Sequence, residues 1–225
     1  MLKPDEYFKG PTPKRSVFLH FTAGWDNPYR VVQDWENDAR DKIATQFVIG
    51  GQHGQTLADQ YDGEIVQCLP DYGCYGWHLG IGNTELHRTS IGIEICSLGP
   101  LKSSQGDYLM WAGKKVRPEV VVDLKRDFRG YRYFQKITDE QLKSTKFLLE
   151  KIAKETGIDI RKGLQQYIKT EKDVFKAFDY REAVKTKNMG GLFCHTHVSP
   201  PNRWNNFEKF DIQPQQEVID MILSL

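Results

Sequence analysis

Residues 17–24 read Val-Phe-Leu-His-Phe-Thr-Ala-Gly, so an apolar run leads into a histidine and then into small residues. This pattern predicts a buried β-strand that presents His20 near its end. Because side chains alternate along a strand, His20 is expected on the face opposite Val17 and Leu19. A histidine at the tip of a core strand can be aimed into a cleft. The alternative is a core histidine bonded to its neighbours.

A second apolar stretch also ends in a histidine: residues 190–195 read Gly-Gly-Leu-Phe-Cys-His, and Asp211 follows in a loop. Two histidines and one carboxylate, with a fourth position open, form the ligand set of a catalytic zinc site. Structural zinc sites are more often closed by four ligands rich in cysteine. Zinc is redox-silent, so the chemistry expected at His20, His195 and Asp211 is hydrolysis.

Glu94 interrupts the isoleucines of the predicted strand 90–96, Ser-Ile-Gly-Ile-Glu-Ile-Cys. A buried glutamate is costly unless it is paired or used. If its face borders the metal, Glu94 can take a proton from water and pass it to the leaving amine. A glutamate facing solvent from an edge strand is the alternative. Lys209, two residues before Asp211, is a candidate to stabilise an oxyanion, although a solvated lysine is the simpler interpretation.

The remaining elements follow from periodicity and capping signals. Strands are expected at 43–50 and, after a turn at Asp62-Gly63, up to residue 70, as antiparallel neighbours. Helices are expected at 28–41, from the capping box at Thr138 to Gly157, at 173–178 and at 215–225. Residues 1–15 are predicted to be an irregular lead-in, and 99–135 to be polar and irregular with a short strand at 120–124.

Bulk properties exclude several classes of protein. The 225 residues carry a formal net charge of +1, which gives no electrostatic footprint for nucleic acid or an anionic membrane. No apolar run is long enough to span a membrane, and the N-terminus lacks a signal-peptide pattern, so synthesis in the cytoplasm without an export address is expected. The four cysteines contain no Cys-x-x-Cys pair and are expected to be free thiols in a reducing compartment.

Several motifs together resemble one family. They are His20-Phe-Thr-Ala-Gly24, Trp77-His-Leu-Gly80, Asn83, Ser90-Ile-Gly-Ile-Glu94, His195-x-x-Val-Ser-Pro200 and Lys209-x-Asp211. In this order they resemble the zinc-dependent N-acetylmuramoyl-L-alanine amidases of the amidase-2 type, which are related to phage lysozyme-like amidases and peptidoglycan recognition proteins. The resemblance covers about residues 15–225 and is greatest to the phage and prophage branch.

The resemblance implies an α/β fold with a central mixed β-sheet flanked by helices, as one catalytic domain over residues 1–225. It implies zinc bound by His20, His195 and Asp211, with Glu94 and Lys209 as catalytic residues. Trp77, His78 and Asn83 match the stretch that lines the family's substrate groove. His197, two residues after the second ligand, could compete with it for the metal. The segment between His195 and Asp211 is longer than usual, with an insertion at about 202–207.

The implied reaction is hydrolysis of the amide between N-acetylmuramic acid and L-alanine in peptidoglycan or muropeptides, by a monomer. Two alternatives stay open. Recognition proteins of this fold bind the same ligands without cleaving them, and a cytoplasmic enzyme could recycle wall fragments. An endolysin or an exported effector would act on the wall itself.

Overall fold

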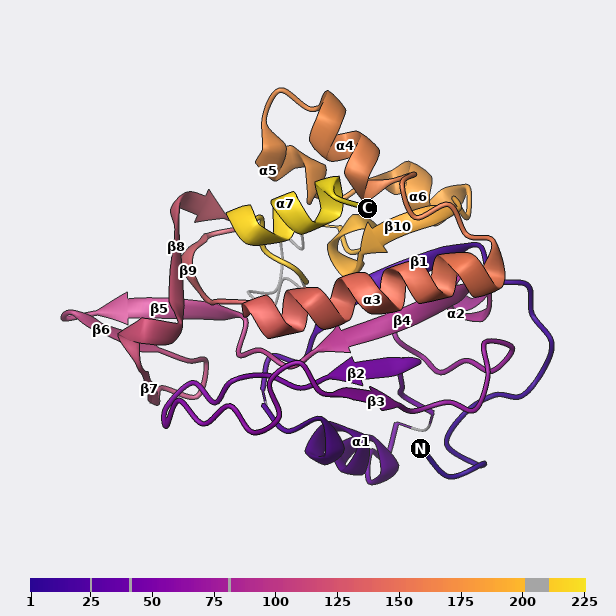
Figure 1. The fold of residues 1–225 in the computed structure, drawn as a ribbon, viewed down its shortest axis with the longest axis horizontal. Coiled ribbons are helices and arrows are strands. Elements are labelled where there is room, and N and C mark those ends of the chain that lie inside the picture. Colours follow the sequence, from indigo (N-terminus) through magenta and orange to yellow (C-terminus); the bar gives the residue numbers. More distant parts are fainter. Residues whose placement is uncertain (25, 41, 81, 201–210) are drawn as a thin grey trace.

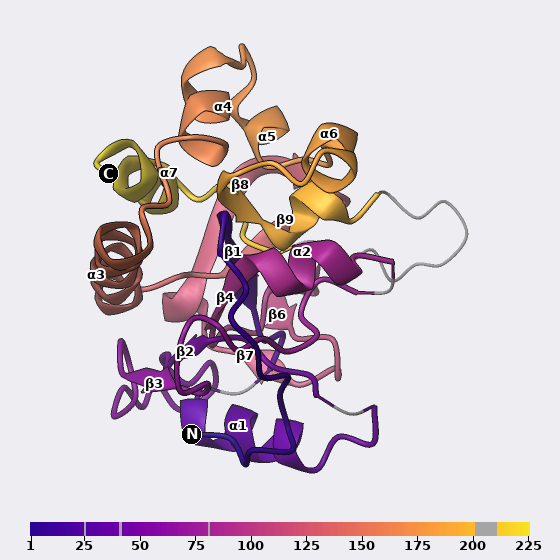
Figure 2. The same cartoon turned by 90° about the vertical axis from the view of Figure 1, so that its right-hand side faces the viewer.

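The computed structural model describes residues 1–24, 26–40, 42–80, 82–200 and 211–225. Its centre is a five-stranded sheet with the strand order β10-β1-β4-β2-β3 (Figure 1). The strands are β1 (Ser16–Phe21), β2 (Phe47–Ile49), β3 (Ile65–Gln67), β4 (Ser90–Ile95) and β10 (Gly191–Cys194). Helices lie on both faces of this sheet (Figure 2), so the predicted α/β fold with a central mixed sheet is confirmed.

Strand direction brings distant parts of the chain to one edge of this sheet. β1 runs parallel to both of its neighbours, β10 and β4, and β2 runs parallel to β4. β3 pairs antiparallel with β2, as the sequence predicts, although both strands are shorter than expected. The carboxyl ends of parallel strands meet at the same edge, where α/β proteins usually bind ligands. His20, Glu94 and His195 therefore all reach this edge.

One face of the sheet is apolar and lies beneath α3 (Asp139–Thr156) and α7 (Gln216–Leu223). Val17 and Leu19 belong to this core, as the predicted alternation requires. The capping box at the start of α3 is present: the Thr138 hydroxyl accepts from the backbone N–H of Gln141, whose side chain accepts from the N–H of Thr138. Gly157 ends the helix with a φ of 76°, a conformation that suits glycine.

The opposite face carries α1 (Pro28–Glu36) and α2 (Thr84–Thr89), on the other side of the sheet from α3 in Figure 2. α1 packs Val31 and Val32 against Val48 and Val66 of the sheet. It ends five residues earlier than predicted, at Glu36. Near α2, Phe18 and Phe193 pack against Leu79 and Leu86. This second face therefore has separate apolar clusters, and His20 and Glu94 belong to the same face.

The prediction that residues 99–135 are irregular is wrong. They form a second, antiparallel sheet with the order β7-β6-β5-β9-β8. Its strands are β5 (Pro100–Ser104), β6 (Asp107–Leu109), β7 (Lys115–Val116), β8 (Val121–Phe128) and β9 (Tyr131–Gln135), with a 3₁₀ helix at Pro118–Val120. Much of this sheet faces solvent; in β5, for example, Leu101 is buried while residues 102–104 are exposed. Such strands need few apolar residues, so their periodicity is weak.

The chain between α3 and β10 forms three short helices, α4 (Leu164–Thr170), α5 (Val174–Ala177) and α6 (Glu182–Thr186). The predicted helix at 173–178 is confirmed as α5. All four cysteines are buried free thiols, as expected. Among the described residues, no helix has the length and apolar character needed to cross a lipid bilayer.

Candidate metal centre and active site

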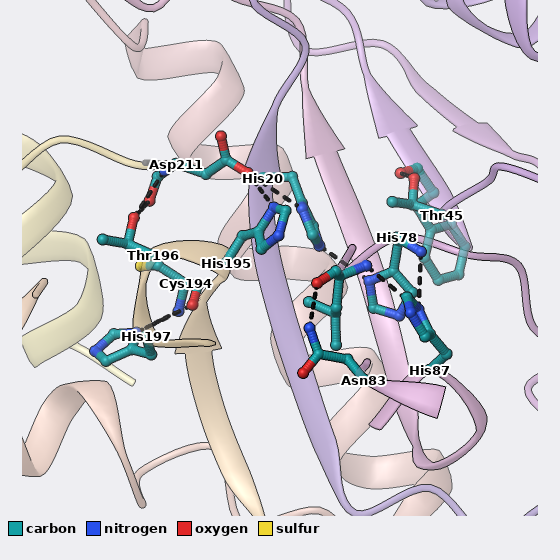
Figure 3. A network of polar contacts seen from close by, with 12 residues as sticks. His20, Thr45, His78, Asn83, His87, Cys194, His195, Thr196, His197 and Asp211 are labelled. Atoms are coloured by element: carbon teal, nitrogen blue, oxygen red, sulfur yellow. Dashed lines mark hydrogen bonds and ion pairs between the residues drawn. The ribbon is translucent and has the colours of Figure 1, made fainter. Parts of the chain in front are cut away.

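Three side chains converge at the carboxyl edge of the central sheet. Asp211 Oδ2 lies 2.8 Å from Nδ1 of His195 and 3.3 Å from Nδ1 of His20. One ligand atom from each residue lies within 4.8 Å of the others. Figure 3 shows the three side chains turned toward one another. The structure therefore brings together the three residues that the sequence analysis proposed as metal ligands.

Each of these residues is held by the fold. His20 is the fifth residue of β1, and His195 follows β10, which is paired with β1 in parallel register. Asp211 is fixed through its backbone, because Thr196 Oγ1 accepts from the Asp211 N–H at 2.7 Å and donates to the Asp211 carbonyl oxygen at 2.7 Å. Thr196 is fully buried. The position of the third candidate ligand, Asp211, is thus set by the residue next to the second histidine.

The pKa of Asp211 is shifted because its carboxyl group is buried between the imidazoles of His20 and His195. Burial by itself would raise the pKa of Asp211. The hydrogen bond and charge interaction with His195, together with the nearby imidazole of His20, outweigh burial and hold this pKa well below its usual range. Asp211 is therefore a carboxylate, the form that binds a metal ion.

The donor set fits a zinc ion. Ligand atoms about 2.0–2.1 Å from a tetrahedral zinc are separated from one another by roughly 3.3 Å. The distance from the Asp211 oxygen to Nδ1 of His20, 3.3 Å, matches this value, and the distance to Nδ1 of His195, 2.8 Å, is shorter. Two imidazoles and one carboxylate leave a fourth position for water or substrate. The Nδ1 atoms of His20 and His195 are the nitrogens placed for this role.

His197 is not part of this cluster in the described structure. It lies in the 3₁₀ helix η2 (His195–Val198), because β10 ends before it and strand alternation does not continue. Its Nδ1 accepts from the Cys194 N–H at 2.9 Å, and its Nε2 donates to the Ala177 carbonyl oxygen at 2.8 Å. Burial lowers the pKa of His197 to about 4. His197 is a neutral core histidine, and the alternative in which it competes for the metal is not supported.

Glu94 lies beside the candidate metal centre. It is the residue of β4 paired with His20 of β1, so both side chains leave the same face of the sheet. Its side chain is partly buried and lines a cavity of about 510 Å³. The alternative of a solvent-facing edge strand is wrong, because β4 is an inner strand between β1 and β2. Lys209 lies outside the described residues.

The cavity beside Glu94 is walled by two separate parts of the chain. One wall comes from α1 and the segment after it, including Trp35 and Arg40. The other comes from the turn between β6 and β7, where Trp111 is 72% exposed. The Trp111 indole N–H donates to the Ala23 carbonyl oxygen at 2.9 Å, which ties this turn to the loop after β1. The second sheet thus contributes a wall of the cavity.

Trp77, His78 and Asn83 do not line this cavity in the described structure. The Trp77 ring packs edge-on against His87 and Phe8. The Asn83 amide donates to the Leu79 carbonyl oxygen and is buried. These two side chains therefore make contacts within the protein.

His78 lies beside His20, on the side away from His195 and Asp211 (Figure 3), with its Nδ1 3.0 Å from the His20 Nε2. Its other ring nitrogen, Nε2, lies 3.0 Å from Ser90 Oγ. Burial, and then the neighbouring imidazole of His20, lower the pKa of His78 well below its usual value. His78 is neutral, and both of its ring nitrogens face protein atoms.

A family model described as N-acetylmuramoyl-L-alanine amidase, Amidase_2, matches residues 10–182. The chain belongs to this family. The amidase family predicted from the motifs is therefore confirmed. The matched residues include His20 and Glu94, whereas His195 and Asp211 lie beyond them. Their place in the candidate metal centre depends on the geometry described above.

Solved structures of amidases are similar to the chain only distantly. AmiD from E. coli, solved in complex with anhydro-N-acetylmuramic acid-L-Ala-D-γ-Glu-L-Lys, is 22% identical over 68% of this chain and 47% of its own, with a TM-score of 0.41. The catalytic domain of XlyA is 19% identical over 70% and 74%, with a TM-score of 0.39. A mutant endolysin from Bacillus subtilis is 20% identical over 79% and 98%, with a TM-score of 0.40. The chain spans less than half the length of AmiD. No curated protein matches the sequence of this chain.

Two residues that support the candidate centre were not identified by the sequence analysis. Thr196 holds the backbone of Asp211 through two hydrogen bonds. The only sequence feature that could have indicated this role is its position between His195 and His197. Ser90, at the start of β4, forms a hydrogen bond with the His78 ring. In the sequence it was recognised only as part of a family motif. Both are small hydroxyl residues whose role depends on tertiary contacts, which local sequence does not reveal.

Proposed function

We propose that the protein is a zinc-dependent amidase that hydrolyses the bond between N-acetylmuramic acid and L-alanine in peptidoglycan or its fragments. The observation that carries this proposal is the convergence of His20, His195 and Asp211 beside Glu94 in a chain of the amidase family. A recognition module that only binds needs neither a complete ligand set nor a glutamate beside it.

The residues divide into two roles. His20, His195 and Asp211 would hold the zinc ion, which when bound would activate water and polarise the scissile carbonyl. Glu94 accepts a proton from the attacking water and delivers it to the nitrogen of the departing peptide. A partly buried carboxylate at the rim of the cavity suits both steps, because the substrate enclosing it excludes bulk water. Lys209 is proposed to stabilise the oxyanion, on the strength of its motif.

The substrate is proposed to lie along the cavity between α1 and the β6–β7 turn. Trp35 and Trp111 supply flat apolar surfaces on its two sides, and Arg40 and Lys114 supply donors for carboxylates or carbonyl groups. Trp77, which is not among the residues that line this cavity, is proposed as a substrate contact on the strength of its motif alone. All proposed groups come from a single chain, which agrees with action as a monomer.

The decisive experiment measures the release of L-alanine-terminated peptides from purified peptidoglycan and from soluble muropeptides. Wild type and Glu94→Gln are compared, and zinc is quantified in both. We expect cleavage by wild type and a loss of roughly 10²–10⁴-fold in Glu94→Gln with the same zinc content. Zinc without cleavage of either substrate would contradict the enzyme and favour a binding module. Comparison of the two substrates separates a wall-degrading enzyme from a recycling one.

A further inference from the structure

A chain of hydrogen bonds runs from the candidate metal centre into the protein through His20, His78 and Ser90. Ser90 Oγ lies 2.5 Å from the Leu86 carbonyl oxygen and 3.0 Å from His78 Nε2. His78 Nδ1 in turn lies 3.0 Å from His20 Nε2. None of these three residues is among those that line the cavity described above.

The direction of this chain follows from its last member. A carbonyl oxygen can only accept, so the single hydroxyl hydrogen of Ser90 is donated to Leu86. Ser90 Oγ must then accept from His78, which places a ring hydrogen on Nε2, and an uncharged imidazole carries only this one. His78 Nδ1 is left with its lone pair and accepts from His20. The hydrogen of His20 consequently resides on Nε2.

The consequence for the centre is a fixed tautomer. An imidazole that carries its hydrogen on Nε2 presents the lone pair on Nδ1, and Nδ1 is the His20 atom 3.3 Å from Asp211 Oδ2. A ligating histidine whose other nitrogen is hydrogen-bonded is held in orientation and is a better donor. We propose that His78, locked by Ser90, is a positioning residue that sets the tautomer of His20 for metal binding through Nδ1. This replaces the expectation that His78 binds substrate, and it rests on the proposed ligand role of His20.

The surroundings of His78 support this role. A Cβ built on Gly92 of β4 would lie 3.0 Å from His78 Nδ1 and 2.8 Å from Thr45 Cγ2. The His78 ring can therefore approach the β4 backbone this closely only because residue 92 has no side chain. On another side, the His78 ring packs against His87 with centroids 5.4 Å apart. His87 accepts from the His78 backbone N–H at 2.9 Å through its own Nδ1. Although His78 is partly exposed, contacts on these sides of the ring determine its orientation.

The test compares two substitutions of similar size, His78→Leu and His78→Asn. The amide oxygen of asparagine can stand near the position of Nδ1 and accept from His20, whereas leucine cannot. Zinc affinity is measured by competition with a chelator of known affinity, and folding is checked by thermal unfolding of the zinc-free proteins. We expect zinc affinity to fall by roughly 10–100-fold in His78→Leu and to stay within a few-fold of wild type in His78→Asn.

A second measurement reads the tautomer directly. NMR of isotope-labelled histidine in zinc-loaded wild type should show the His20 hydrogen on Nε2 and the metal on Nδ1. Ser90→Ala should weaken zinc binding in the wild-type background and leave it unchanged when combined with His78→Leu. Equal zinc affinity in wild type and His78→Leu, or a metal on His20 Nε2, would overturn the inference. A wild type that binds no zinc would instead refute the proposed function.

Discussion

His20 on β1 and Glu94 on β4 are directly paired residues of adjacent parallel strands, and their side chains leave the same face of the sheet. Neighbouring strands lie about 4.8 Å apart, so the backbone itself fixes the spacing between a candidate ligand and the candidate proton carrier. This spacing does not depend on a loop. Small changes in the length of either side chain should therefore be felt in catalysis.

Glu94→Asp tests that geometry, because it keeps the charge and withdraws the carboxylate by one methylene. Since a displacement of about 1 Å can cost about 10²-fold, we expect a loss of activity of that order with unchanged zinc content. The measurement is the rate of muropeptide cleavage at saturating zinc. Activity close to wild type would mean that Glu94 does not carry the proton.

Gly92→Ala should disturb the centre without touching a ligand. Its new Cβ would lie 2.8 Å from Thr45 Cγ2 and 3.0 Å from His78 Nδ1, both too close for a relaxed contact. We expect a loss of about 1–3 kcal/mol in the free energy of unfolding, together with weaker zinc binding. Chemical denaturation and zinc competition measure the two effects. An unchanged zinc affinity would show that the His78 ring can shift without consequence.

His197→Leu and His195→Ala should separate stability from metal binding. His197 makes two buried hydrogen bonds with backbone groups of Cys194 and Ala177. Leaving those groups without a partner should cost about 1–3 kcal/mol each in folding stability, while zinc is still bound. His195→Ala is expected to lose zinc and to retain most of the stability of the zinc-free protein. Loss of zinc in a folded His197→Leu protein would restore His197 as a competing ligand.

His87 predicts a specific dependence of stability on pH. Burial lowers its pKa to about 4, although its hydrogen bond to Gly80 opposes this shift. Unfolded His87 titrates at about 6.5, so between these values the unfolded state binds more protons than the folded state. Its contribution, up to about 3 kcal/mol, is complete above pH 6.5 and is lost as the pH falls toward 4.

The check is urea unfolding of wild type and His87→Asn at pH 7 and pH 5, without zinc. Asparagine keeps an acceptor for the His78 backbone but does not titrate in this range. Wild type should lose more stability between the two pH values than His87→Asn does. Other titrating groups cancel in this comparison, so equal losses would contradict a neutral, buried His87.

The features predicted correctly from the sequence are those encoded by local chemistry. The alternation in 17–20 placed His20 on the correct face of β1, and the capping box at Thr138 marked the start of α3. The convergence of two strand-end histidines with Asp211 also followed from their residue types. The second sheet could not be predicted in this way, because its half-exposed strands carry few apolar residues. The role of His78 depends on Ser90 and Leu86, contacts that appear only after folding.

The candidate centre takes its ligands from the first strand of the central sheet and from residues that follow its last strand in sequence. A fragment that ends before Asp211 would contain β1, β4 and both histidines but would lack the third ligand. The proposed hydrolysis would therefore begin only after that residue has joined the fold.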